Sequence, residues 1–287
     1  MEILTTLKSE AYELLDSGDG EKLERFGNVV LSRPENQAIW SKTLSKEDWD
    51  KADAVFSHGE KATRWEILKK VPDSWEVDFG GLKFSVELLP SKHLGVFPEQ
   101  VQNWEWLENK ILSSNRKVSV LNLFGYTGGA SMACSRAGAE VTHVDASKFA
   151  MDLANKNFEL SGLKDRPVKY ILDDVRKFVE REIKRGKKYD IILMDPPVYG
   201  KGAKKEVWKI EKDLMPLLLR VLEILSPEPI TVLLNGYASI YSYISYENIL
   251  KDVTSKLGGQ VVAGKLTIKE SSSGKLLPCG IFARWEK

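Results

Sequence analysis

Residues that can bind a nucleotide-like ligand follow a short apolar run near the middle of this chain. Residues 118–123 are rich in aliphatic side chains, a pattern typical of a strand buried on both faces. Gly125, Gly128 and Gly129 come next and indicate a tight turn into a helix. Such glycines remove side chains where a ligand approaches the backbone, and the N–H groups of the helix attract negative charge. The spacing is not Gly-x-Gly-x-x-Gly, so a dinucleotide is not the expected ligand.

Acidic residues follow the next two apolar runs. Asp145 ends the second run, about 20 residues after the first glycine, where a carboxylate can accept hydrogen bonds from ribose hydroxyls. Asp173 and Asp174 follow the third run, where a carboxylate can bind the exocyclic amine of adenine while Val175 packs on its face. An acid at that place is equally common as a helix N-cap, and the sequence favours neither role. Together, the glycine turn and Asp145 indicate a nucleotide site.

The fourth apolar run ends in the most specific motif of the chain, Asp195-Pro196-Pro197. The two prolines fix φ and turn the chain over the sheet edge, which places Asp195 and the Pro196 carbonyl in the ligand cleft. Tyr199 follows, and it can either stack on an extruded base or pack within its own loop.

A basic loop continues from this motif and contains Lys201, Lys204, Lys205, Trp208 and Lys209. Lysines neutralise phosphates and an aromatic ring can stack on a base, so the loop is the strongest local candidate for RNA contact. A solvated loop with one packed tryptophan explains the same residues equally well.

Strand and helix patterns alternate from about residue 90 to the end, which predicts an α/β fold with a Rossmann-like, doubly wound and mostly parallel sheet of seven strands. The expected strands are residues 118–123, 140–144, 168–172, 191–194, 230–234, 261–268 and 277–285. Ser147 is expected to cap a helix that ends near Gly162. Basic side chains near the end of the helix after residue 174 favour a solvated face over a phosphate site; they are Arg181, Lys184, Arg185, Lys187 and Lys188.

The first part of the chain predicts a smaller, β-rich domain. Asp19-Gly20 and Gly80-Gly81 each separate two partly apolar runs, as in β-hairpins. Residues 29–31 form a strand stopped by Pro34, and residues 46–56 are expected to be partly helical. Four tryptophans here are favoured as core anchors over base-stacking platforms. We therefore expect an N-terminal domain over residues 1–90, which could bind substrate, and a second domain over residues 91–287.

Composition limits the function classes. The 287 residues carry a formal net charge of +1, so any contact with nucleic acid must come from a local basic patch. The first ten residues lack the pattern of a leader peptide, and no apolar stretch is long enough to predict a membrane span. Cys134 and Cys279 form neither a disulfide framework nor a metal motif, which favours a reducing cytoplasm and no metal centre.

These motifs resemble those of the class I S-adenosylmethionine-dependent methyltransferases. Within them the similarity is greatest to the methyltransferases of large-subunit (23S) ribosomal RNA, a group that includes cytosine-5 enzymes. The segment from His93 to Gln100 looks like the part of that group that closes over the methionine end of the cofactor. The motifs that carry the resemblance are Asn122-Leu123-Phe124-Gly125-Tyr126-Thr127-Gly128-Gly129, Val144-Asp145-Ala146-Ser147, Asp173-Asp174-Val175 and Asp195-Pro196-Pro197.

The resemblance implies S-adenosyl-L-methionine as the cofactor and assigns roles to individual residues. The implied cofactor-binding residues are Phe97, Phe124, Gly125, Tyr126, Thr127, Gly128, Asp145, Ala146, Asp173, Asp174, Val175 and Asp195. The implied catalytic residues are Asp195, Pro196 and Tyr199. The expected substrate-binding residues are Tyr199, Lys201, Lys204 and Lys205.

One departure from the family concerns the chemistry. Methylation at carbon 5 of cytosine needs a cysteine thiolate to attack carbon 6. Cysteine-dependent members carry this residue after the fourth or fifth strand, whereas Cys134 and Cys279 lie elsewhere in this chain. We therefore expect direct in-line transfer to a base nitrogen or a hydroxyl, with ribosomal RNA as the leading acceptor.

Other functions stay open at this stage. A protein or a small molecule could replace RNA as the methyl acceptor, because the net charge is close to neutral. The same sheet order also occurs in nicotinamide-dependent oxidoreductases, and a catalytically silent RNA-binding module would keep the fold. The sequence leaves the oligomeric state open, with a homodimer among the options.

Overall fold

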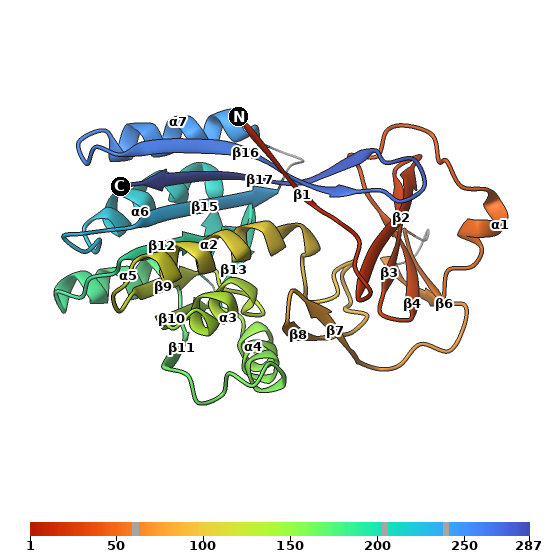
Figure 1. The fold of residues 1–287 in the computed structure, drawn as a ribbon, viewed down its shortest axis with the longest axis horizontal. Coiled ribbons are helices and arrows are strands. Elements are labelled where there is room, and N and C mark those ends of the chain that lie inside the picture. The colour runs from red at the N-terminus through yellow and green to blue at the C-terminus, as the bar shows by residue number, and fades with distance from the viewer. Residues whose placement is uncertain (59–62, 203–205, 238–240) are drawn as a thin grey trace. The chain divides into compact units, whose positions relative to one another are not determined.

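The computed structural model describes residues 1–58, 63–202, 206–237 and 241–287 (Figure 1). The chain divides into two compact units. The sheet unit contains Met1–Ile3, Asn103–Lys265 and Gly280–Lys287, and the N-terminal unit contains Leu4–Gln102 and Leu266–Cys279. Each unit therefore takes residues from more than one part of the chain, which a single boundary near residue 90 does not describe.

A large, mostly parallel sheet organises the sheet unit and confirms the predicted fold class. Its order is β1-β16-β17-β15-β12-β9-β10-β11. The strands β11, β10, β9, β12 and β15 pair in parallel, and β17 pairs antiparallel with β15. Their bounds are β9 Ser119–Leu123, β10 Glu140–Asp145, β11 Val168–Leu172, β12 Ile191–Met194, β15 Thr231–Tyr237, β16 Gln260–Lys269 and β17 Leu276–Glu286.

The described part of this sheet has eight strands, not the predicted seven. The additional strand is β1, Glu2–Thr6, which lies at the sheet edge beside β16. Its pairing partner is more than 250 positions away in the sequence, so local patterns gave no indication of it.

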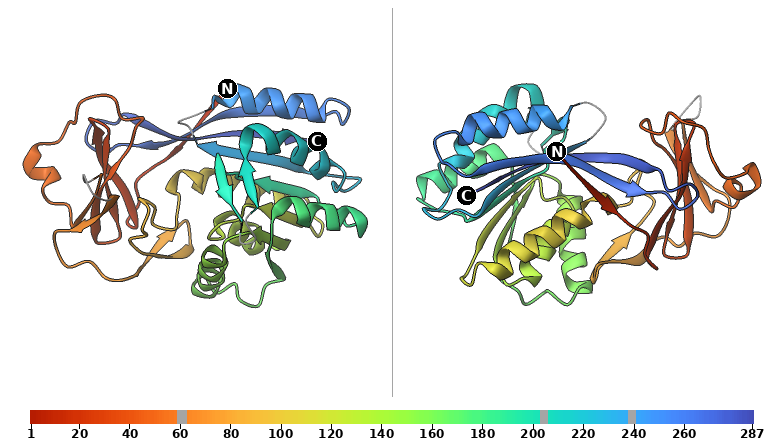
Figure 2. Two further views of the ribbon diagram at one scale, coloured as in Figure 1. Left: turned by 180° about the vertical axis from the view of Figure 1, so that it is seen from behind. Right: turned by 45° about the horizontal axis from the view of Figure 1, so that its top comes forward.

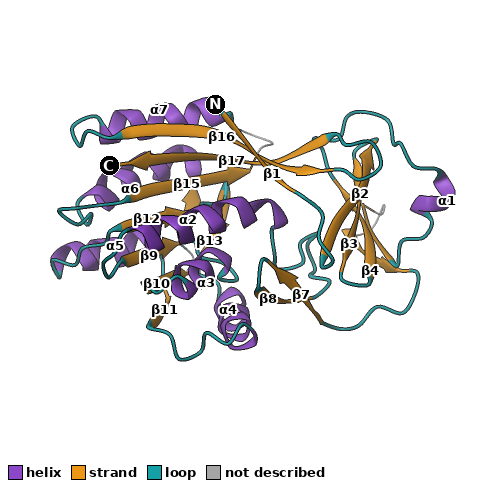
Figure 3. Ribbon diagram, viewed as in Figure 1, coloured by secondary structure: helices purple, strands orange, loops and turns teal. Residues whose placement is uncertain are grey.

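Helices cover both faces of the parallel strands (Figure 3). One face carries α2 (Val101–Ser113), α3 (Gly129–Arg136) and α4 (Lys148–Leu160). The other carries α5 (Val175–Lys184), α6 (Ile210–Leu222) and α7 (Tyr243–Thr254), which pack on the sheet through the main apolar core. Ser147 caps α4 as predicted, because its hydroxyl accepts the Ala150 N–H.

The strand order reverses next to β9, since β10 lies on one side of it and β12 on the other. In open α/β sheets, ligands bind at such a switch point, outside the carboxyl ends of the strands. The glycine turn and the acids of the first four motifs all follow carboxyl ends of strands at this edge.

The N-terminal unit has two small sheets. The first has the order β2-β3-β4-β5-β6 and the second is the hairpin β7-β8. Both predicted hairpins are present. The bounds are β2 Tyr12–Gly18, β3 Glu21–Phe26, β4 Val29–Pro34, β5 Ala54–His58, β6 Thr63–Ile67, β7 Trp75–Phe79 and β8 Leu82–Val86.

The prediction that residues 46–56 are partly helical is confirmed for the first four of them and wrong for the last three. Only α1, Lys46–Trp49, is helical, and Ala54–His58 forms β5 beside β4. Ala54 and Phe56 are buried, so the side chains alternate as in a strand.

The four tryptophans of this region are anchored in the N-terminal unit. Each indole N–H donates to an acceptor of its own unit, at distances from 2.8 to 3.0 Å. These tryptophans are Trp40, Trp49, Trp65 and Trp75. These hydrogen bonds agree with the anchor interpretation, although only Trp49 is buried and the other three are half-buried. Of the helices in the described ranges, none is long and apolar enough to cross a membrane.

Candidate active site

The turn between β9 and α3 has an unusual backbone. Phe124 and Tyr126 have φ values of 58° and 48°, and Gly128 has a φ of 92°. Left-handed conformations are costly for residues other than glycine and are concentrated at functional sites. Gly128 is the N-cap of α3, so the turn presents the first N–H groups of this helix.

Two of the three glycines, Gly125 and Gly129, are needed because side chains of the protein itself occupy the space where their Cβ atoms would lie. A Cβ on Gly125 would lie 2.4 Å from Cε1 of His143 in β10. A Cβ on Gly129 would lie 2.3 Å from Cζ2 of Trp104 in α2. The glycines therefore bring the turn close to the sheet and to α2, and this refines the sequence interpretation.

A chain of buried polar side chains supports the turn from behind. The Asn122 amide donates to Ser131 Oγ at 2.9 Å, and Ser131 Oγ lies 2.9 Å from His143 Nδ1. His143 is fully buried, and burial lowers its pKa to about 4. A neutral imidazole therefore packs beneath Gly125 at physiological pH.

Asp145 fixes the turn to the end of β10. Its Oδ2 accepts the Tyr126 N–H at 2.9 Å, and its Oδ1 accepts the Ser147 N–H at 2.8 Å. Burial raises the pKa of this carboxyl, and the backbone donors oppose that effect. Half-buried Ala146 follows it, and buried Thr127 is held by the Asn157 amide, which donates to the Thr127 carbonyl at 3.0 Å.

The two acids after β11 are both ion-paired in this structure. Asp174 caps α5 by accepting the N–H groups of Arg176 and Lys177, which is the N-cap role left open above. Its Oδ2 also accepts a hydrogen bond from Arg176 Nη2 at 2.8 Å. Burial raises the pKa of Asp174, but the Arg176 ion pair outweighs that effect and holds the pKa below its usual value. Asp173 pairs with Arg181.

Buried Val175, the first residue of α5, is a member of the main apolar core. The adenine-side residues predicted from the sequence therefore lie together at one helix N-terminus.

The Asp195-Pro196-Pro197 motif follows β12 as predicted. Asp195 is exposed and Pro196 is buried. The Pro197 carbonyl accepts the indole N–H of Trp208 at 2.6 Å. The same indole packs edge-on against Phe124, with ring centroids 4.9 Å apart. The structure thus connects the fourth motif to the glycine turn.

The basic segment after this motif contains a hairpin of β13, Tyr199–Lys201, and β14, Val207–Lys209 (turquoise in the left view of Figure 2). Tyr199 is 52% exposed and Lys201 is exposed, so both can reach a substrate. Trp208 is only 5% exposed, which supports the packed alternative for this ring. Lys204 and Lys205 lie outside the described residues.

Phe97 and the two cysteines complete the residues considered in the sequence analysis. Phe97 belongs to the N-terminal unit, where its ring centroid is 5.3 Å from that of His93. Cys134 in α3 and Cys279 in β17 are buried, and burial raises the pKa of both thiols.

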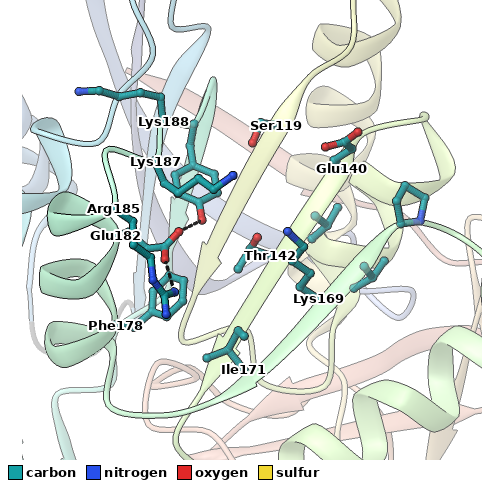
Figure 4. Close-up of a pocket in the computed structure, with 14 residues that line it drawn as sticks. Ser119, Glu140, Thr142, Lys169, Ile171, Phe178, Glu182, Arg185, Lys187 and Lys188 are labelled. Carbon is teal, nitrogen blue, oxygen red and sulfur yellow. Dashed lines mark hydrogen bonds and ion pairs between the residues drawn. The ribbon is translucent and has the colours of Figure 1, made fainter.

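A cavity of about 380 Å³ lies at the opposite end of the sheet (Figure 4). It is lined by residues where strands begin, including Ser119 and Val168, together with the end of α5. Arg185 pairs with buried Glu182 at 2.9 Å, and Lys188 donates to the Glu223 carbonyl at 2.7 Å. These interactions agree with the solvated-face interpretation of the basic run.

Comparison with known proteins identifies the family. A family model described as S-adenosylmethionine-dependent methyltransferase matches residues 55–254. The chain belongs to this family. S-adenosylmethionine is therefore the cofactor, and the nicotinamide-dependent oxidoreductase alternative is excluded.

Relatives of this methyltransferase include a solved structure and ribosomal RNA enzymes. The crystal structure of the SAM-dependent methyltransferase from Agrobacterium tumefaciens is 39% identical, with a TM-score of 0.95 over 100% of this chain and 93% of that one. Ribosomal RNA large subunit methyltransferase I from Aeromonas salmonicida is 32% identical over 146 residues, covering 50% of this chain and 34% of that protein. The Escherichia coli K12 enzyme of the same name is 27% identical over 238 residues, covering 74% and 58%. The methyltransferase thus spans less than two thirds of these two curated relatives.

Three residues that shape the site were not predicted as site residues. Arg176 and Arg181 pair with the acids after β11, and His143 supports Gly125. An arginine two positions after an N-cap aspartate is the only local hint for Arg176. Both arginines reach the acids from α5 itself, whereas His143 reaches Gly125 through the pairing of β10 with β9, which local patterns do not describe.

Proposed function

We propose that this methyltransferase binds its cofactor at the carboxyl edge of β9, β10, β11 and β12. The strained turn at Phe124–Gly128 would hold the methionine part, and Asp145 would accept the ribose hydroxyls. Asp174, with Asp173 and Val175 beside it, would face the adenine. Two observations support the fit: the left-handed turn leads directly into the N-terminus of α3, and the Asp145 carboxylate is already oriented by two backbone donors.

The bound cofactor supplies an electrophilic methyl group on a sulfonium centre. The protein's part is to position the acceptor in line with that group and to exclude water. Exposed Asp195 and the Pro196 carbonyl would accept hydrogen bonds from an acceptor amino group and orient its lone pair. Tyr199, exposed on the adjoining hairpin, would stack on the acceptor base.

We propose RNA, with ribosomal RNA as the leading candidate, as the methyl acceptor. The exposed aromatic and cationic side chains of the hairpin, Tyr199 and Lys201, beside Asp195 carry this proposal, and the names of the ribosomal RNA relatives agree with it. Transfer would be direct, to a base nitrogen or a hydroxyl, because both thiols are buried with raised pKa values.

Calorimetry with S-adenosylhomocysteine tests the cofactor site. Asp145→Ala is expected to weaken binding by about 10- to 100-fold, because it removes charge-assisted hydrogen bonds and releases the Tyr126 N–H. Asp152→Ala is the matched control: Asp152 is an exposed acid on α4 that pairs with Lys148. Equal affinities for the wild type and Asp145→Ala would refute the assigned site.

A nucleoside comparison tests the acceptor. Ribosomal RNA from cells with and without the gene is digested, and its modified nucleosides are measured. We expect one methylated nucleoside to disappear with the gene and to return with the wild type but not with Asp195→Ala. An unchanged profile, with cofactor binding intact, would favour a protein or small-molecule acceptor instead.

A further inference from the structure

Trp208 of β14 contacts three parts of the candidate site. Its ring lies against Phe124 of the glycine turn, with centroids 4.9 Å apart, and its indole N–H donates to the Pro197 carbonyl at 2.6 Å. The guanidinium carbon of Arg176 in α5 lies 5.9 Å from the ring centroid. The buried indole therefore lies where the methionine, acceptor and adenine segments of the proposed site meet.

Arg176 also binds the backbone of the same hairpin. Besides pairing with Asp174, its Nη1 donates to Asp213 Oδ1 of α6 at 2.9 Å and to the Val207 carbonyl of β14 at 3.2 Å. The residue that caps α5 is thus connected through one guanidinium to the backbone next to Trp208. The hairpin is attached to the proposed adenine side as well as to the turn.

Trp208 and Tyr199 lie on the two paired strands of one short hairpin. Gly200 pairs with Trp208 across the hairpin, and Tyr199 pairs with Lys209. The Ile210 N–H donates to the Val198 carbonyl at 3.1 Å and closes the base of the hairpin. Because Trp208 also holds the Pro197 carbonyl, a shift of the indole would move the segment between Asp195 and Tyr199.

We propose that Trp208 is a positioning residue that couples the cofactor turn to the acceptor-binding hairpin. Phe124 and Pro197 are held relative to each other through the indole, so the hairpin is ordered when the turn is held by the cofactor. This inference rests on the proposed function, since it takes the turn as the cofactor site and the hairpin as the acceptor site.

Hydrogen exchange of the hairpin, with and without S-adenosylhomocysteine, tests the coupling. In the wild type, the ligand is expected to slow amide exchange at Gly202 and Ile210, whose N–H groups donate across the hairpin, by about fivefold or more. Trp208→Leu should remove this protection while calorimetry still detects ligand binding. Trp106→Leu is the matched control, because Trp106 is a half-buried tryptophan of α2 that packs with Arg284 and Lys110. It should keep the wild-type protection.

Each outcome decides a different question. Full ligand-induced protection in Trp208→Leu, or none in a wild type that binds the ligand, would overturn the coupling and leave the proposed function standing. A wild type that does not bind the ligand would overturn the proposed function, and this inference with it. If circular dichroism shows that Trp208→Leu is unfolded, the Trp208→Phe variant is used instead. It keeps a ring against Phe124 but loses the N–H donor to the Pro197 carbonyl, so we expect partial ligand-induced protection. Unchanged protection in Trp208→Phe would refute the proposal.

Discussion

His143 explains why the turn begins with a glycine. The imidazole occupies the space that a Cβ of Gly125 would need, and Ser131 holds its Nδ1. The turn therefore rests on a rigid, neutral side chain that belongs to the next strand. This contact restricts the backbone at Gly125 before a ligand binds, and restricted sites bind with a smaller loss of conformational freedom.

Protonation of His143 should destabilise the fold in mild acid. Its pKa is lowered from 6.5 to about 4 in the folded chain. The unfolded chain therefore takes up this proton first as the pH falls, so the stability present above pH 6.5 is lost progressively towards pH 4. Between pH 7 and pH 5 we expect this residue to cost about 2 kcal/mol of unfolding free energy.

Urea unfolding at the two pH values, followed by circular dichroism, measures this loss. His143→Gln is the test variant, because a glutamine does not titrate. His93 has a similarly lowered pKa in the N-terminal unit, so His93→Gln serves as a comparison that leaves the His143 contribution in place. An unfolding free energy that falls equally in wild type and His143→Gln would contradict the assignment.

At the scale of elements, the start of α5 combines two roles for Asp174. Its carboxylate caps the helix and pairs with Arg176, and the proposed function also gives it the adenine amine. Asp174→Ala should lower the unfolding free energy by about 1 kcal/mol, because two N–H groups lose their acceptor. Asp174→Ser should recover most of that loss, since serine is also a good N-cap.

Cofactor affinity separates the two roles. Both Asp174 variants should bind S-adenosylhomocysteine more weakly, because serine restores the cap but not the negative charge. Urea unfolding and calorimetry on the same three proteins provide the comparison. Wild-type affinity in Asp174→Ser would mean that Asp174 acts only as a cap.

Most strands of the sheet could be predicted because their signals are local. Residues 168–172 and 191–194 were predicted with the bounds that β11 and β12 have in the structure. The strands β13 and β14 have three residues each, too few for a periodic pattern, and β1 depends on a distant partner. Long-range pairing and short elements thus account for much of what the sequence analysis missed.

The candidate site was predictable in its positions but not in its contacts. Each motif residue directly follows a predicted strand. Because parallel strands bring their carboxyl ends to one edge of the sheet, these residues were expected to meet there. The contacts of these residues could not be predicted. Arg176 pairs with Asp213, which is 37 positions away, and Phe124 packs against Trp208. Such pairs depend on how α5, α6 and the hairpin pack, and this information is not local.

At the scale of the whole molecule, the end of the β16-β17 hairpin belongs to the N-terminal unit. Buried Glu270 accepts from Ser17 at 2.5 Å, and Ser272 donates to buried Asp16 at 2.7 Å. A fragment of residues 91–287 should therefore unfold at a lower temperature than the complete chain. It would leave residues 266–279, including buried Leu277, without their partners.

Thermal unfolding by circular dichroism checks this expectation. The matched control adds residues 1–90 as a separate peptide, which should restore part of the lost stability. Hydrogen exchange within residues 266–279 should be fast in the fragment and slow in the complete chain. An identical unfolding midpoint for fragment and complete chain would contradict the prediction.

The same hairpin has a consequence for the order of folding during synthesis. Ser17 and Glu270 are 253 positions apart, so the N-terminal unit cannot close before residues 266–279 have been made. Domains usually form as they emerge, amino end first, and contacts between distant positions slow folding. In this chain the parallel strands β9 to β15 leave the ribosome before the β16-β17 hairpin does. We expect residues 4–102, which are made before the sheet strands, to reach their final structure after them.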